Sequence, residues 1–142
     1  MRLALAGGGT GGHVHPGLHL LADPVVSDGL ADVLWFQSGR SVEDRAFENA
    51  ALAVEVARVT LKLEKEGGGA PSLRGLAFKT GPAVKVARRA LRAHGSDVLL
   101  GLGGFTSLPA VLAARSLGVP VALFEINALP GKATPIPSSM WA

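Results

Sequence analysis

A glycine-rich segment near the N-terminus is the first feature of this sequence that could do chemistry. Five of the six residues from Gly7 to Gly12 are glycines, and the segment joins a short apolar run to a predicted helix. Without side chains the backbone can approach a phosphate closely, and free N–H groups at a helix start favour its charge. The segment fits the pattern G-x-G-x-x-G, which indicates a phosphate-bearing ligand without saying which one.

His13 follows the last glycine of this segment directly. A histidine at that place faces whatever the loop holds, and its imidazole could accept a proton as a general base does. A histidine that only hydrogen-bonds within the loop is an equally good interpretation from position alone. His15 and His19 do not adjoin the loop, and we interpret them as structural or surface residues.

A second glycine cluster comes later in the chain. Gly101, Gly103 and Gly104 follow the apolar run 97–100, and Phe105 comes next. In a parallel sheet this cluster shares the carboxyl edge with the first loop, and ligands bind there at the switch in strand order. Two glycine loops on one edge suggest a diphosphate or a sugar nucleotide. An ordinary tight turn between a strand and a helix is the alternative.

Two polar residues, Glu125 and Asn127, follow the apolar run 120–124. Their alternation predicts that both lie on one side of a strand, at the same edge as the glycine loops. The amide of Asn127 both donates and accepts hydrogen bonds, which suits sugar hydroxyls. For Glu125, a cap or an ion pair at the strand end is an equally good interpretation.

A dinucleotide cofactor is the competing ligand for the first loop, and it would indicate a nucleotide-dependent oxidoreductase. Such a site needs an acidic residue at the end of the second strand, where the acid holds the ribose. Here that strand runs into residues 37–40, which contain no acid, and the first acid is Glu43. We therefore rank the oxidoreductase low.

The positive charge is concentrated in one segment. The formal net charge is +3, but residues 67–96 contain six cations and no acid. Four of them share one face of a predicted helix: Lys85, Arg88, Arg89 and Arg92. Leu76, Phe78 and Lys79 come just before, and apolar residues ringed by cations suit an anionic membrane surface. A solvated basic face is the commoner alternative, and nucleic acid ranks lowest because few aromatic residues could stack bases.

The elements that must position these residues alternate along the chain. Apolar runs predict strands over 2–6, 32–36, 52–59, 97–100 and 120–124. The segments between them predict helices over 14–22, 41–49, 82–94 and 106–117, with Pro82 as a first helical residue. This alternation predicts an α/β fold with a Rossmann-like open parallel sheet. We expect one domain over residues 1–134 and an irregular tail over 135–142.

The composition excludes several classes of protein. Hydrophobic residues make up 48% and charged residues 18% of the 142 residues, as in a globular domain. The absence of cysteine excludes a disulfide framework and a thiolate metal site. No apolar run reaches the roughly 18 residues of a membrane span, and the first run is too short for a signal peptide, so we expect a cytoplasmic protein.

Two stretches resemble the MurG family of bacterial lipid-linked N-acetylglucosaminyltransferases. GGGTGGHVHPGL, residues 7–18, resembles the first glycine loop of the family. DVLLGLGGFTSLPAVLAARSLGVPVALFEINALPG, residues 97–131, resembles its second glycine loop, the next helix and its HEQNAxPG segment. The resemblance implies the N-terminal, acceptor-side half of a GT-B fold, in which two Rossmann-like halves enclose the active site.

The resemblance also implies an activity and a location. The family transfers GlcNAc from UDP-GlcNAc to the C4 hydroxyl of undecaprenyl-diphospho-MurNAc-pentapeptide, converting lipid I to lipid II in peptidoglycan synthesis. The reaction uses no covalent intermediate and no tightly bound metal, so UDP-GlcNAc is a substrate and no cofactor is expected. The acceptor-side half lies on the inner face of the cell membrane.

Roles follow by position in the matching motifs. His13 and Glu125 become candidate catalytic residues. The resemblance assigns donor or phosphate binding to Thr10, Gly11, Gly12 and Asn127. It assigns the acceptor diphosphate loop to Gly9, Gly103, Gly104 and Phe105. Membrane contact falls on Leu76, Phe78, Lys79, Lys85, Arg88, Arg89 and Arg92.

The sequence departs from the family in two places. HEQN is FEIN here, with Phe124 for histidine and Ile126 for glutamine. We also expect no donor-binding domain within these 142 residues, so activity would need one, for which a separate polypeptide is a possible source. The rival interpretation is a non-catalytic protein that binds a lipid diphosphate, and the changes at Phe124 and Ile126 favour it.

Overall fold

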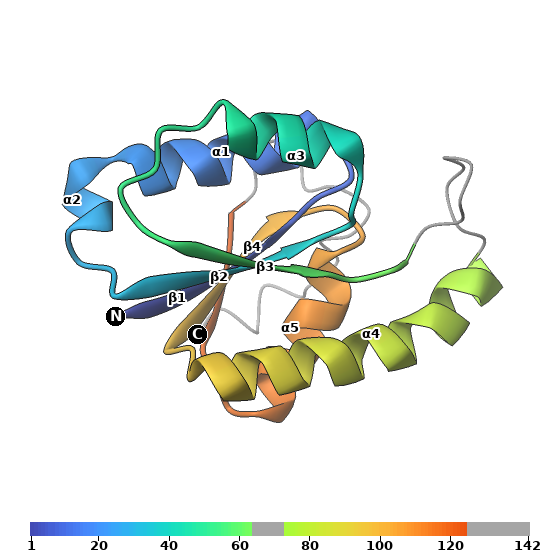
Figure 1. Cartoon of the computed structure of the whole chain (residues 1–142). Helices are drawn as coiled ribbons and strands as arrows, with labels where there is room; N and C mark the ends of the chain where they lie inside the picture. The colour runs from blue at the N-terminus through green and yellow to red at the C-terminus, as the bar shows by residue number, and fades with distance from the viewer. Residues whose placement is uncertain (64–72, 125–142) are drawn as a thin grey trace.

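A single five-stranded parallel sheet forms the centre of the molecule (Figure 1). The computed structural model describes residues 1–63 and 73–124, with the backbone alone over 73–79. The strand order is β3-β2-β1-β4-β5. The strands are β1 (Arg2–Gly7), β2 (Asp32–Gln37), β3 (Val56–Thr60), β4 (Val98–Gly103) and β5 (Val121–Leu123). The predicted Rossmann-like open sheet is confirmed.

The sheet changes direction between β1 and β4. The chain moves outward from β1 to β2 and β3, then returns across the sheet to place β4 on the other side of β1. Leu5 of β1 pairs with Trp35 of β2 on one side and with Leu100 of β4 on the other. The two glycine-rich turns therefore follow neighbouring strands and flank the switch point, where parallel sheets bind their ligands.

Helices cover both faces of the sheet (Figure 1). One face carries α1 (Gly11–Ala22), α2 (Pro24–Ser27) and α3 (Ser41–Glu48), and the other carries α4 (Leu73–His94) and α5 (Ser107–Ser116). Alternate residues of β2 serve the two layers: Trp35 packs in the core under α1 and α3, and Phe36 packs in the core under α4 and α5. Both side chains are fully buried.

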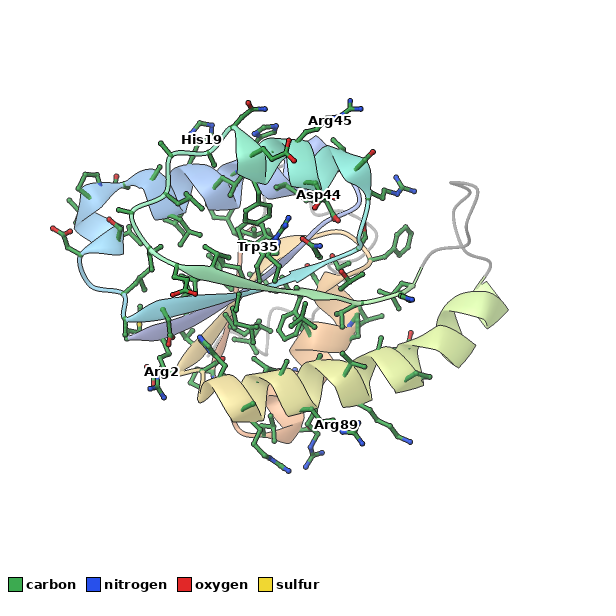
Figure 2. All side chains as sticks on the ribbon, viewed as in Figure 1. Arg2, His19, Trp35, Asp44, Arg45 and Arg89 are labelled. Carbon is green, nitrogen blue, oxygen red and sulfur yellow. The ribbon has the colours of Figure 1, made fainter. Side chains whose placement is uncertain are left out.

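Helix α1 lies close to the sheet because Gly17 has no side chain. A Cβ at Gly17 would lie 2.5 Å from both Leu102 Cδ1 and Trp35 Cη2. The indole of Trp35 is seen between the sheet and the α1 layer (Figure 2), and its Nε1 donates a hydrogen bond to Gly7 O at 2.9 Å. This close packing fixes the start of α1 relative to the end of β1.

The predicted starts of two elements, α4 and β3, were wrong. Helix α4 begins at Leu73 and runs through Pro82, because packing of Ala83, Ala87 and Leu91 in the core holds it despite the missing proline N–H. Strand β3 begins at Val56 rather than residue 52, since the preceding apolar residues pack against the α1 side of the core without a strand partner.

None of the helices in the described ranges is long and apolar enough to span a membrane.

Candidate functional site

The first glycine turn is shorter than the sequence predicted, because α1 begins at Gly11 rather than at residue 14. Thr10 is the N-cap residue, and Gly11 and Gly12 form the start of the first helical turn. An α-helix leaves its first N–H groups without intrahelical partners. Within the described residues, no acceptor is found for the N–H of Gly11 or Gly12. These two amides are thus open to an anion at the positive end of the helix.

His13 lies between the two glycine turns. Its Nδ1 is 2.9 Å from Thr10 Oγ1, and its backbone N–H donates to Thr10 O at 3.2 Å. The ring packs against the backbone of the second turn: a Cβ at Gly103 would be 3.0 Å from His13 Cδ2, and one at Gly104 would be 3.4 Å from Nδ1. The side chain is half-buried. The structure thus brings together the histidine and both glycine clusters.

The second glycine turn consists of the end of β4 and the residues before α5. Gly101 and Gly103 belong to β4, which runs three residues further than predicted because their backbone pairs with β1. Gly103 has φ +94° and Gly104 φ +79°, a region that side chains disfavour. A Cβ at Gly104 would also be 2.9 Å from Gly8 O, so the two turns touch. Phe105 follows and is 44% exposed.

Glu43 contacts the first glycine turn, a place that was not predicted for it from the sequence. It is fully buried in the first turn of α3, and its Oε1 accepts the N–H of Gly9 at 2.8 Å. Its Oε2 accepts the N–H of Arg40 at 2.9 Å, the bond made by an acid three residues into a helix. That spacing was visible in the sequence, but the contact with Gly9 spans 34 positions and was not.

The contacts of Glu43 also bear on the dinucleotide alternative. Glu43 is the first acid after β2, the position from which a carboxylate would hold a ribose. Both of its oxygens instead accept hydrogen bonds from the protein, from the turn that contains Gly9 and from the turn that contains Gly39. A ribose would have to displace these donors, so the structure weakens the oxidoreductase interpretation further.

Some predicted site residues lie outside the described part of the chain. Glu125 and Asn127 follow directly after it, and the side chains of Leu76, Phe78 and Lys79 are not described, although their backbone is helical. Phe124, the last described residue, is 50% exposed. The roles of these residues remain predictions.

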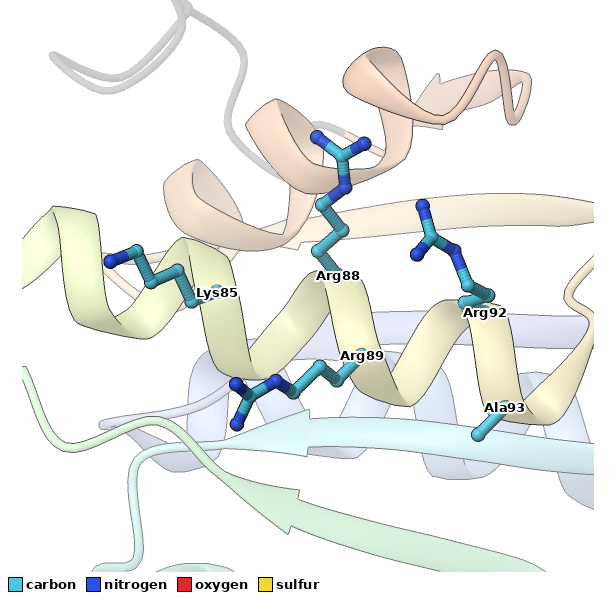
Figure 3. Close-up of a pocket in the computed structure, with 5 residues that line it drawn as sticks. All are labelled: Lys85, Arg88, Arg89, Arg92 and Ala93. Carbon is cyan, nitrogen blue, oxygen red and sulfur yellow. The ribbon is translucent and has the colours of Figure 1, made fainter.

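The basic residues of α4 form a separate surface, on the opposite face of the sheet from α1 (Figure 1). Lys85, Arg88, Arg89 and Arg92 are exposed and line one groove. Arg88 extends toward α5, where its Nη1 donates to Ser116 Oγ at 3.2 Å, while Arg89 does not point toward α5 (Figure 3). Across the described ranges, no acidic side chain forms an ion pair with any of the four. The groove is therefore a concentrated positive surface.

Fold and site together define a Rossmann-like domain whose glycine turns meet at the switch point. The chain belongs to the family described as the glycosyltransferase family 28 N-terminal domain, whose model matches residues 3–141. The predicted family and the predicted GT-B type of fold are thereby confirmed.

The chain is similar to two bacterial enzymes named UDP-N-acetylglucosamine–N-acetylmuramyl-(pentapeptide) pyrophosphoryl-undecaprenol N-acetylglucosamine transferase. Identity is 41% to the Magnetococcus marinus enzyme and 37% to the Pelobacter propionicus enzyme, each over 131 residues. The match covers 92% of this chain but 34% of each relative. The chain thus spans about a third of the length of these curated relatives.

The structure is similar to two solved glycosyltransferases. The crystal structure of Acinetobacter baumannii MurG has a TM-score of 0.66 at 30% identity, and the match covers 92% of this chain and 35% of that one. The calicheamicin glycosyltransferase CalG4 has a TM-score of 0.65 at 16% identity, covering 99% of this chain and 34% of that one. The second likeness shows the fold alone.

Proposed function

We propose that this chain forms the acceptor-side half of a GlcNAc transferase. Its substrates would be UDP-GlcNAc and an undecaprenyl-diphosphate-linked MurNAc-pentapeptide, and its product would be lipid II of peptidoglycan synthesis. The observation that carries the proposal is the position of His13, between two glycine turns at the switch point of the sheet. The activity in the names of the Magnetococcus and Pelobacter relatives supports the choice of substrates.

In this proposal His13 is the base that activates the acceptor. If Nδ1 is protonated and donates a hydrogen bond to Thr10 Oγ1, Nε2 is unprotonated and can accept the proton of the C4 hydroxyl. The C4 oxygen then bonds to the anomeric carbon of GlcNAc, while the bond from that carbon to UDP breaks and UDP leaves with the electron pair. Thr10 orients the imidazole through the same contact.

The glycine turns would hold diphosphate groups. Gly11 and Gly12 offer open N–H groups at the start of α1, and Gly103 and Gly104 allow a close approach of the backbone. Gly9 differs from the others, because its N–H already donates to Glu43. Its role in this proposal is to shape the turn. Glu125 as a second catalytic residue and Asn127 as a contact to the donor sugar complete the proposed site.

A transfer assay tests this proposal. The chain is mixed with a separate polypeptide that carries the donor-binding half of a relative, and GlcNAc transfer to lipid I is measured. We expect transfer from the mixture and none from either polypeptide alone. Tight NAD(P)H binding without any response to a lipid diphosphate would overturn the proposal in favour of an oxidoreductase.

A non-catalytic protein that binds a lipid diphosphate is the second candidate. The exposed Phe124 favours it, since this position carries no titratable group where the family has histidine. The same assay separates the two candidates. Binding of the lipid diphosphate without transfer, at saturating concentrations of a donor half that is active with its own partner, would support the second candidate.

We further propose that α4 and α5 together contact the inner face of the cell membrane. Leu108 and Leu112 are exposed apolar residues of α5, and Phe105, in the turn just before the helix, is also exposed. Helix α4 packs beside α5 and carries the four cations described above, none of which forms an ion pair within the described residues. Apolar residues next to cations suit an anionic surface, at about 1 kcal/mol per cation.

Vesicle binding tests the membrane contact. Reversal of charge at Arg88 and Arg89 (R88E/R89E) should weaken binding to anionic vesicles by about tenfold or more. Arg45→Glu is the matched control, because Arg45 lies on α3 on the opposite face of the molecule from Arg89 (Figure 2). Equal binding by R88E/R89E and the unmodified chain would rule out this surface.

A further inference from the structure

Glu43 is a buried acid in a helical turn that is otherwise open to solvent. Its side chain is 0% exposed, whereas Val42 and Asp44 on either side are exposed. Acidic side chains are almost never fully buried unless they are paired, because the loss of water around the charge is costly. The partners of Glu43 therefore indicate why the acid is there.

Five protein groups donate hydrogen bonds to the two oxygens of Glu43. Oε1 accepts from the N–H of Gly9 (2.8 Å), the N–H of Ser38 (3.0 Å) and the hydroxyl of Ser38 (2.9 Å). Oε2 accepts from the N–H of Gly39 (2.6 Å) and of Arg40 (2.9 Å). Four of the five donors are main-chain amides. The carboxylate thus joins the turn after β1 to the turn after β2.

Gly9 is held through both of its polar groups. Its N–H donates to Glu43 Oε1, and its carbonyl oxygen accepts from Arg40 Nη1 at 2.9 Å. Its φ of +88° is a conformation that residues with side chains rarely adopt. The peptide groups on both sides of Gly9 therefore have a fixed orientation, and its N–H points into the protein.

The carboxylate also lies directly against Gly8. A Cβ at Gly8 would overlap Glu43 Oε1 and lie 2.9 Å from the backbone nitrogen of Ser38. The absence of a side chain at Gly8 is therefore required by Glu43 itself. This contact makes Glu43 part of the packing of the glycine turn.

The fixed turn leads directly to His13. Thr10 follows Gly9 and contacts His13 twice, through its carbonyl oxygen (3.2 Å to His13 N) and through its hydroxyl (2.9 Å to His13 Nδ1). Gly11 and Gly12, with their open N–H groups, come between them. Any rotation at Gly9 would therefore move the imidazole and these amides together.

We infer that Glu43 is a positioning residue for the phosphate-binding turn. By holding the N–H of Gly9 inside the protein, it selects the amides of Gly11 and Gly12 as those that face a diphosphate. It also sets the orientation of Thr10 and, through it, of the His13 imidazole. This inference rests on the proposed function, because it assumes that the turn binds a diphosphate.

Titration with inorganic pyrophosphate tests the inference, with the amide resonances of Gly11 and Gly12 followed by NMR. Glu43→Gln puts an NH2 group against two backbone N–H groups in either orientation of the amide. Glu43→Asp keeps the charge but shortens the reach. We expect both variants to bind pyrophosphate at least about tenfold more weakly than the unmodified chain, a loss of about 1.4 kcal/mol. Asp44→Asn, one position along the same helix and exposed, should bind unchanged.

The folded state of each variant is checked from the resonances of β4 and α5, so that only folded protein contributes to the dissociation constant. A purely structural Glu43 would lower the melting temperature but leave the affinity of the folded protein unaltered. A folded Glu43→Gln or Glu43→Asp variant with unchanged affinity would overturn the inference. If the unmodified chain gives no response to pyrophosphate, the diphosphate site of the proposed function fails instead.

Discussion

The two edges of the sheet both carry polar networks, but the networks are built differently. At the amino edge side chains pair mainly with each other: Asp32 Oδ1 lies 2.8 Å from His94 Nε2, and Ser96 Oγ lies 2.7 Å from His94 Nδ1. At the carboxyl edge Glu43 takes its donors mainly from the backbone of two turns. The open amides of Gly11 and Gly12 stand beside that network.

We therefore expect the amino-edge network to contribute mainly to stability and the carboxyl-edge network mainly to ligand binding. The amino-edge network ties β2 to the end of α4: His94 Nε2 lies 2.8 Å from Asp32 Oδ1 without the geometry of a hydrogen bond, and His94 Nδ1 is hydrogen-bonded to Ser96 Oγ. The carboxyl-edge network holds a turn in place and leaves hydrogen-bonding capacity for a ligand. His13 lies at the carboxyl edge and His94 at the amino edge, so a substitution of each histidine tests one network. Substitutions at the two edges should therefore have different consequences.

The largest expected effect is on transfer by His13→Ala. If His13 is the base, GlcNAc transfer in the presence of a donor half should fall by about 10²- to 10⁴-fold. The free energy of unfolding should change by less than about 1 kcal/mol, because the ring is half-buried. His19→Ala, exposed on the same helix, is the control. Unchanged transfer by His13→Ala would show that His13 is not the base.

Gly104→Ala should cause the largest loss of stability. The new side chain would occupy a left-handed conformation, at about 1–2 kcal/mol, and its Cβ would lie 2.9 Å from Gly8 O. We expect a total loss of about 2–4 kcal/mol in urea unfolding. Gly118→Ala is the matched control, because Gly118 has φ +72° with nothing within 4 Å of its Cβ position. Equal losses at both positions would mean that the two glycine turns do not need their close contact.

His94→Ala should affect stability but not ligand binding. It leaves the buried Ser96 hydroxyl without its partner, so the free energy of unfolding should fall by about 1–3 kcal/mol. The dissociation constant for pyrophosphate, measured on the folded protein, should not change. Weaker pyrophosphate binding by folded His94→Ala would contradict the division between the edges.

The smallest expected effect is that of Gly95→Ala at the amino edge. Gly95 has φ +67°, but the nearest atom to an added Cβ is Arg2 Nη1 at 3.0 Å, the end of a flexible side chain that can move. We expect a loss of about 1 kcal/mol, from the backbone conformation alone. Urea unfolding beside Gly104→Ala gives the comparison directly. A loss as large as that of Gly104→Ala would show that the amino edge is packed as tightly as the carboxyl edge.

The sequence predicted the fold and part of the site. Apolar runs such as residues 32–36 form strands that are buried on both faces, so they are visible without any knowledge of their neighbours. Both glycine turns and His13 were found because ligand loops of parallel sheets follow strand ends.

The sequence did not predict the features that depend on contacts between residues far apart along the chain. The contact of Glu43 with Gly9 joins two turns that are separated along the chain by helices α1 and α2 and by strand β2. The start of β3 depends on where β2 offers a partner, which the alternation from residue 52 does not show. The passage of α4 through Pro82 likewise depends on burial against the sheet and α5, which outweighs the local preference of proline.

The hydrogen bond from Trp35 to Gly7 gives the protein an intrinsic optical reporter. The indole is fully buried and its Nε1 is bonded to the residue from which the first glycine turn departs. The emission of this fluorophore responds to the polarity and hydrogen bonding around it, so a ligand that shifts the turn should shift the wavelength of its emission maximum. The sequence has one other tryptophan, Trp141, and a Trp141→Phe variant leaves a single emitter at the base of the site. Occupancy of the glycine turn could then be followed in real time, without a label.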